Sequence, residues 1–76
     1  MEKEKFLVKF AEQFDETDVS EIMLDTVFKN LEEWSSLTAL SIIAMCDEEY
    51  SIKVTGEDIR NIETVEDLYK LVNSRK

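Results

Sequence analysis

The run from residue 34 to residue 50 limits what this chain can fold into more than any other stretch does. It opens on a tryptophan and paired serines, continues without Gly or Pro through a largely apolar segment, and closes on three acids and a tyrosine. Serine is favoured at helix starts because its hydroxyl accepts a hydrogen bond from a backbone N–H of the first turn. The pattern therefore predicts a helix over about residues 36–49, around which the other segments pack.

This predicted helix is apolar on two sides. One stripe at helical spacing is expected to face the core, and it comprises Ala39, Ile42, Ile43, Cys46 and Tyr50. We expect the lone Cys46 to be a buried hydrophobic residue rather than a reactive thiol. A neighbouring stripe comprises Leu37, Leu40 and Ala44. Because one apolar face is enough to anchor a helix, we interpret this second stripe as a surface that docks a partner.

The N-terminal half predicts one helix followed by an ambiguous segment. Residues 2–14 have helical periodicity, and residues 15–20 are polar and rich in cap formers, which ends that helix. Its inner face is predicted to comprise Leu7, Phe10 and Phe14, flanked by Phe6 and Ala11. Residues 21–34 fit either a second amphipathic helix or a long ordered loop held by its apolar side chains. We expect Trp34 to anchor the chain by packing.

The C-terminal part predicts two further helices. Residues 51–54 alternate like a strand but have no partner strand, so we interpret them as an extended linker. Thr55 is a predicted N-cap, and Thr64 with Asp67 resembles a capping box. The side chains predicted to point inward are Ile59, Ile62, Val65, Leu68, Leu71 and Val72. The predicted fold class is all-α, a small four-helix bundle.

Composition narrows the class of protein. With 76 residues, 43% of them hydrophobic and 36% charged, the chain is expected to form a single globular domain over residues 1–76. One cysteine cannot form an internal disulfide, which favours a reducing cytoplasm. No apolar run of about 18 residues and no apolar signal region occur, so neither a membrane span nor export is expected.

Charge and missing residue types exclude several functions. Residues 11–50 contain eleven acids against Lys29 alone, a local charge of -10. Such a segment disfavours nucleic-acid binding and suits recognition by basic protein surfaces, although it also serves simple solubility. No EF-hand spacing of calcium ligands occurs. Without histidine and with one glycine, the chain lacks a histidine-based catalytic centre, a histidine metal ligand and a phosphate-binding loop. A free-standing enzyme is therefore not expected.

A family resemblance covers nearly the whole chain. Ser36-Leu37 follows an apolar and acidic loop and precedes an apolar helix that closes on residues 47–50; this arrangement resembles the Asp-Ser-Leu motif and following helix of acyl carrier proteins. Length, acidity and residues 52–72 also match. The resemblance implies an acyl-carrier bundle with a long loop between the first and second helices. It further implies a 4'-phosphopantetheine arm, received from coenzyme A on Ser36, whose thiol carries acyl groups as thioesters.

The chain departs from the family pattern at three positions. Ser35 replaces the Asp that usually precedes the modified serine, and Thr38 and Ser41 stand where fatty-acid carriers often have acids. These changes predict a less charged docking face and a dedicated partner rather than the general fatty-acid synthase. No Gly-Gly pair precedes the serine, unlike peptidyl carriers. Ser35 is also the competing acceptor, and we expect it to be the helix cap.

The resemblance places the binding residues around this helix. A phosphate on Ser36 would lie beside unpaired backbone N–H groups at the positive end of the helix dipole. The predicted docking set is Leu37, Leu40 and Ala44, with Glu32, Glu33, Asp47, Glu48 and Glu49 supplying charge. The implied partners are a phosphopantetheinyl transferase and acyl-loading and acyl-transfer enzymes with basic patches, of a fatty-acid, polyketide or other specialised pathway. The carrier is expected to be a monomer without catalytic or metal-binding residues.

Two alternatives remain open from the sequence. The chain could be an unmodified acidic helical adaptor that uses the same face only to bind a protein. It could also be an acidic mimic of nucleic acid, which the apolar central helix supports poorly.

Overall fold

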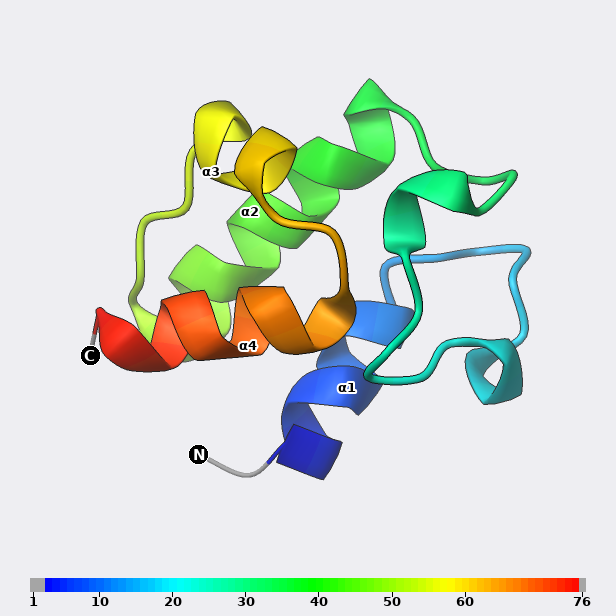
Figure 1. The fold of residues 1–76 in the computed structure, drawn as a ribbon, viewed down its shortest axis with the longest axis horizontal. Helices are drawn as coiled ribbons and strands as arrows, with labels where there is room; N and C mark the ends of the chain where they lie inside the picture. The colour runs from blue at the N-terminus through cyan, green and yellow to red at the C-terminus, as the bar shows by residue number, and fades with distance from the viewer. Residues whose placement is uncertain (1–2, 76) are drawn as a thin grey trace.

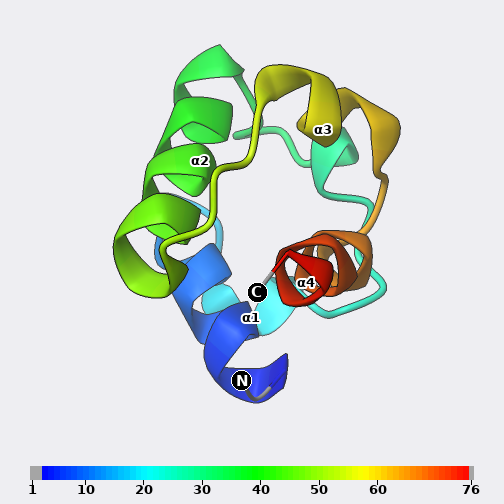
Figure 2. The ribbon, with the colours of Figure 1, turned by 90° about the vertical axis from the view of Figure 1, so that its left-hand side faces the viewer.

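The computed structural model describes residues 3–75, and within that range the chain is helical (Figure 1). The elements in order are α1 (Lys3–Ala11), the 3-10 helices η1 (Val19–Glu21) and η2 (Phe28–Asn30), α2 (Ser36–Tyr50), α3 (Gly56–Asn61) and α4 (Val65–Ser74). Figure 2 shows the four α-helices arranged around a common centre, with α4 seen nearly end-on. The predicted all-α bundle is confirmed. None of the helices in this range is long and apolar enough to cross a bilayer.

One core joins the four α-helices, the loop between α1 and α2, and the linker after α2. Its buried hydrophobic side chains are Phe6, Phe10, Ala11, Phe14, Ile22, Phe28, Ile42, Met45, Cys46, Ile52, Val54, Ile59, Val65, Leu68 and Val72. The set draws on the helices, the long loop and the linker after α2. Because a chain of this size has little apolar surface to bury, each fully buried large side chain, worth about 1.5–3 kcal/mol, matters to stability.

Helix α1 is shorter than predicted, and its inner face is rotated. It ends at Ala11 rather than at residue 14, because the N–H groups of Gln13 and Phe14 bond to carbonyl oxygens three residues back, at 3.1 and 3.0 Å. Phe6 and Ala11, predicted to flank the inner face, are completely buried. Leu7, predicted to lie on the inner face with Phe10 and Phe14, is only half-buried. The predicted helix start at residue 2 lies outside the described residues.

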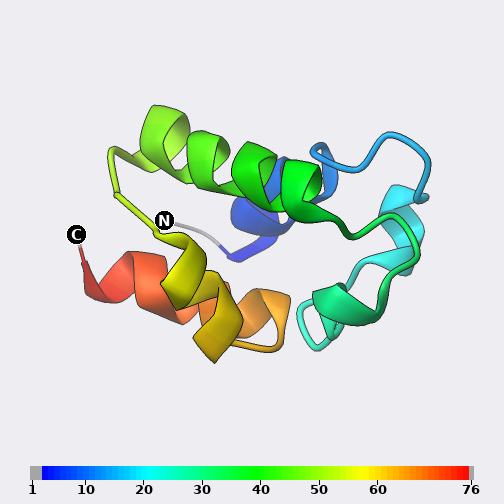
Figure 3. The same cartoon turned by 90° about the horizontal axis from the view of Figure 1, so that it is seen from above.

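The ambiguous segment is a long ordered loop rather than a second α-helix. It closes one end of the bundle, beyond the start of α2 (Figure 3). Its Ile22 and Phe28 side chains are buried, and the Trp34 ring lies 4.8 Å from the Phe28 ring, centroid to centroid. Trp34 is therefore a packing anchor, as predicted. Backbone hydrogen bonds also hold the loop, including that from the Glu66 N–H to the Leu24 carbonyl at 2.9 Å.

Helix α2 is predicted well in extent and less well in orientation. Ile42 and Cys46 are buried as expected, whereas the rest of the predicted core stripe, Ala39, Ile43 and Tyr50, is only half-buried. Thr38 and Met45 are buried instead. The helix packs against both α1 and α3. Its buried side therefore does not coincide with the predicted apolar stripe. Burial raises the pKa of the Cys46 thiol to about 11, which keeps it protonated at neutral pH.

The last two helices begin at the predicted caps. Thr55 and Asp58 form a capping box at α3, and Thr64 and Asp67 form another at α4. Residues 51–54 are a linker, but the predicted extended conformation is wrong at Ser51, which is the left-handed C-cap of α2 with φ 57° and ψ 35°. The side chains of Ile52 and Val54 lie in the core. The Arg75 guanidinium donates to both carboxylate oxygens of Asp58, at 2.7 and 3.0 Å, and joins the end of α4 to the start of α3. Of the side chains predicted to point inward here, Ile62 and Leu71 are only half-buried.

Candidate functional site

Two adjacent serines at the start of α2 have different surroundings. Ser35 is the N-cap, with extended backbone, and its hydroxyl accepts a hydrogen bond from the Thr38 N–H at 3.3 Å. Its hydroxyl oxygen also lies 3.3 Å from that of Thr38, which donates to the Glu33 carbonyl at 3.0 Å. The predicted cap is confirmed. Ser36 is the first helical residue, and its side chain is exposed to solvent.

The backbone at Ser36 suits an anion. The first N–H groups of a helix have no acceptor within the helix, and they form the positive end of its dipole. The first turn of α2 contains no acidic residue that would oppose a negative charge. A phosphate attached at Ser36 would therefore lie in a favourable field.

The Glu33 carboxylate is bound by the start of the long loop. It accepts hydrogen bonds from the N–H groups of Asp15, Glu16 and Thr17 at 2.6, 2.9 and 2.8 Å, and from the Thr17 hydroxyl at 2.8 Å. Desolvation on its own raises the pKa of Glu33, but these hydrogen bonds outweigh it and hold the pKa below its ordinary value. Glu33 thus connects the start of the long loop to the segment just before α2. From the sequence, Glu33 was predicted only as a docking acid, because the N–H groups that donate to its carboxylate lie 16 to 18 residues away.

This contact predicts a pH-dependent stability. Because the folded pKa of Glu33 is lowered, its stabilisation is complete above the ordinary value of 4.5 and is lost as the pH falls through the folded pKa. We expect Glu33→Gln to lower the urea midpoint at neutral pH, since an amide accepts these donors less well. The difference from wild type should shrink below about pH 4. Circular dichroism during urea titration measures both.

The neighbouring Glu32→Gln provides the control. Glu32 is exposed, and its replacement by glutamine makes the same change of charge as Glu33→Gln. Equal midpoints for wild type and Glu33→Gln at neutral pH would show that the hydrogen bonds do not stabilise the fold.

A groove opens beside Ser36, between α2 and α3. It has a volume of about 550 Å³ and is open to solvent. Its lining includes Ala39, Leu40 and Ile43 from α2, Ile59 and Arg60 from α3, and Lys29 and Trp34 from the loop, together with Ser35, Ser36 and Gly56. Within the described part of the chain, no carboxylate lines this groove. The sequence marks Lys29 as the one base between residues 11 and 50 but did not connect it with Ser36, and nothing in the sequence marks Arg60.

The predicted docking stripe is exposed along α2. The side chains of Leu37 and Leu40 are 74% and 62% exposed, and Ala44 is also exposed. Thr38, which we expected on a less charged docking face, is instead buried because its hydroxyl completes the cap. The predicted docking acids Glu32, Asp47, Glu48 and Glu49 are exposed.

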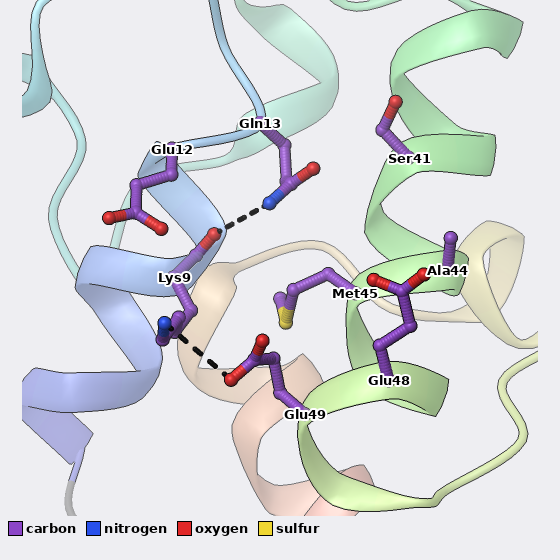
Figure 4. A pocket seen from close by; sticks show the side chains of 8 residues that line it. All are labelled: Lys9, Glu12, Gln13, Ser41, Ala44, Met45, Glu48 and Glu49. Atoms are coloured by element: carbon purple, nitrogen blue, oxygen red, sulfur yellow. Dashed lines mark hydrogen bonds and ion pairs between the residues drawn. The ribbon is translucent and has the colours of Figure 1, made fainter.

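A smaller pocket lies between α1 and the second half of α2 (Figure 4). It has a volume of about 190 Å³, and its lining comprises Lys9, Glu12 and Gln13 from α1 and Ser41, Ala44, Met45, Glu48 and Glu49 from α2. Figure 4 shows the carboxylate of Glu49 directed toward Lys9, 3.5 Å from its ammonium nitrogen. Three carboxylates against one ammonium make this pocket acidic, in contrast to the groove beside Ser36.

Comparisons with known proteins bear on this site. A family model described as "Phosphopantetheine attachment site" matches residues 4–72. A search of curated proteins gave no match. Residues 3–75 contain no group of three or more cysteine, aspartate or glutamate side chains placed to hold a metal ion.

Proposed function

This chain belongs to the family of phosphopantetheine-attachment domains, which are carriers of the acyl-carrier type, and we therefore propose that it is an acyl carrier protein modified on Ser36. The group bound by this family is covalent 4'-phosphopantetheine. When attached, it supplies a thiol on a long arm, which holds acyl groups as thioesters. The protein's own task is to present the attachment point and to be recognised by partners.

The observation that supports Ser36 is its exposed hydroxyl at the first position of α2. Ser35 already accepts a hydrogen bond from the first turn as its cap. The Glu33 carboxylate accepts hydrogen bonds from the loop, and no carboxylate of the described residues 3–75 lines the adjoining groove. The residues present therefore fit a phosphodiester on Ser36 better than one on Ser35.

Intact mass spectrometry tests this function. The purified chain is incubated with coenzyme A and a broad-specificity phosphopantetheinyl transferase, and we expect a gain of one phosphopantetheine. No gain would favour the alternative, an unmodified acidic adaptor that binds a protein through the same helix.

We propose that the partners are enzymes with basic surfaces that recognise the exposed face of α2. Leu37, Leu40 and Ala44 would supply the apolar contact, and the proposed charged contacts are Glu32, Glu33, Asp47, Glu48 and Glu49. Glu33 stays in this set although its carboxylate already accepts four hydrogen bonds. We place the carrier in a specialised fatty-acid, polyketide or related acyl-transfer pathway of the cytoplasm, as one monomeric domain without catalytic residues.

The docking proposal predicts the behaviour of Leu40→Glu. A carboxylate in place of an exposed apolar contact would be desolvated at the interface, so we expect kcat/KM of the transferase to fall about tenfold or more. Helical circular dichroism should be unchanged because Leu40 is exposed. The assay is the rate of phosphopantetheine transfer at limiting carrier concentration.

Val8→Glu is the matched control. Val8 is 48% exposed on α1, so the variant makes the same change of charge away from α2. An equal loss of kcat/KM in both variants, or loss of helicity in Leu40→Glu, would refute a docking role for Leu40.

A further inference from the structure

Two cations meet at the groove beside Ser36, although the chain has a net charge of -9. Lys29 comes from η2 and Arg60 from α3, and the Lys29 ammonium donates to the Arg60 carbonyl at 2.9 Å. No ion pair of either side chain is recorded within residues 3–75. The groove is therefore a locally positive surface whose charges are not neutralised by carboxylates of its own lining.

The charges on the two sides of α2 differ in sign. Figure 2 shows α1 and α3 on different sides of α2. The pocket toward α1 is lined by Glu12, Glu48 and Glu49 with one lysine, whereas the lining of the groove toward α3 has two cations and, among residues 3–75, no acid. An anion attached at Ser36 is attracted to the α3 side and repelled from the α1 side. The same cations would repel a basic partner surface, which disfavours a partner as the occupant of the groove.

We propose that Arg60, supported by Lys29, binds the phosphodiester of the arm and so directs the arm into the groove between α2 and α3. The inference rests on the proposed function, in which Ser36 bears the arm. A guanidinium suits this role because its N–H groups form charge-assisted hydrogen bonds with phosphate oxygens. Lys29, anchored on the α3 carbonyl, adds a second positive charge beside it. Arg60 is thus a positioning residue for the arm.

Chemical shifts of the backbone amides test this proposal without depending on activity. Labelled protein is compared by nitrogen–proton correlation spectra before and after attachment of the arm. In wild type, we expect the amides of Ile59 and Arg60 and the Arg60 side-chain N–H to shift on attachment. In Arg60→Gln, the shift changes on α3 should fall by about half or more, since charge-assisted hydrogen bonds are about twice as strong as neutral ones. Changes at residues 36–38 should remain.

Matched variants separate charge from general disturbance. Lys5→Gln removes the same charge from an exposed position on α1 and should leave the α3 shifts of wild type intact. Arg60→Lys should retain part of them, and added salt should reduce them in wild type. The unmodified Arg60→Gln spectrum should match that of unmodified wild type outside residue 60 and its neighbours, because Arg60 is exposed.

Three results would overturn the inference. The first is attachment of the arm without shifts on α3, and the second is α3 shifts that Arg60→Gln leaves unchanged. The third is α3 shifts that appear only after loading an acyl group with a free carboxylate, which would assign the cations to the cargo. Failure of wild type to gain the arm at all is a different result, because it refutes the proposed function itself.

Discussion

Ser36→Ala is expected to abolish attachment of phosphopantetheine completely. The proposed acceptor is a single hydroxyl, and alanine leaves no oxygen at that position to form the phosphodiester. The fold should be unaffected, because Ser36 is exposed at the first position of α2 and alanine is the best helix former. Intact mass after incubation with coenzyme A and the transferase gives the result.

The neighbouring serine is the control for this prediction. Ser35→Ala removes the cap hydrogen bond to the Thr38 N–H and should cost about 1 kcal/mol of stability, yet the variant should still gain one phosphopantetheine. If Ser36→Ala were modified and Ser35→Ala were not, the arm would belong on Ser35. A full gain in both variants would refute attachment at either serine.

Phe28→Ala is expected to cause the largest loss of stability, about 3–5 kcal/mol. Phe28 lies in the long loop but is completely buried, with its ring centroid 5.5 Å from that of Phe10 and 4.8 Å from that of Trp34. Truncation leaves a cavity between the loop and α1. Because small domains are stable by only about 5–15 kcal/mol, the variant should lose a large part of its stability. Urea denaturation followed by circular dichroism measures the change.

Met23→Ala tests whether any apolar residue of the loop would have the same effect. Its side chain is 56% exposed, so its truncation should change the unfolding free energy by no more than about 0.5 kcal/mol. Similar midpoints for Phe28→Ala and wild type would show that the loop is not held by the core.

Local signals were read correctly from the sequence. Thr55, Thr64 and Asp67 are capping residues, and α2 begins at Ser36 behind the Ser35 cap, as expected. These features depend on contacts between residues three or four positions apart, and such residues come together at the start of any helix. The apolar periodicity likewise identified each α-helix, although it misplaced the end of α1 and the buried side of α2.

Long-range contacts could not be read in the same way. The periodicity of residues 21–34 fitted a helix only in part and left a helix and an ordered loop both open. The segment is a loop, and its Ile22 and Phe28 side chains are buried in the common core. The role of Glu33 depends on N–H donors 16 to 18 residues earlier, and Lys29 meets Arg60 across 31 positions.

The amino-acid sequence by itself determined the helical class, the caps, the exposed serine at the start of α2 and the acidic character of the surface, because each follows from neighbouring residues. Only the tertiary structure decided that the loop is ordered by Phe28, that Glu33 is turned into it, and that two cations face the groove beside Ser36. Those features arise when distant segments share one core, and no periodicity along the chain encodes which segments will meet.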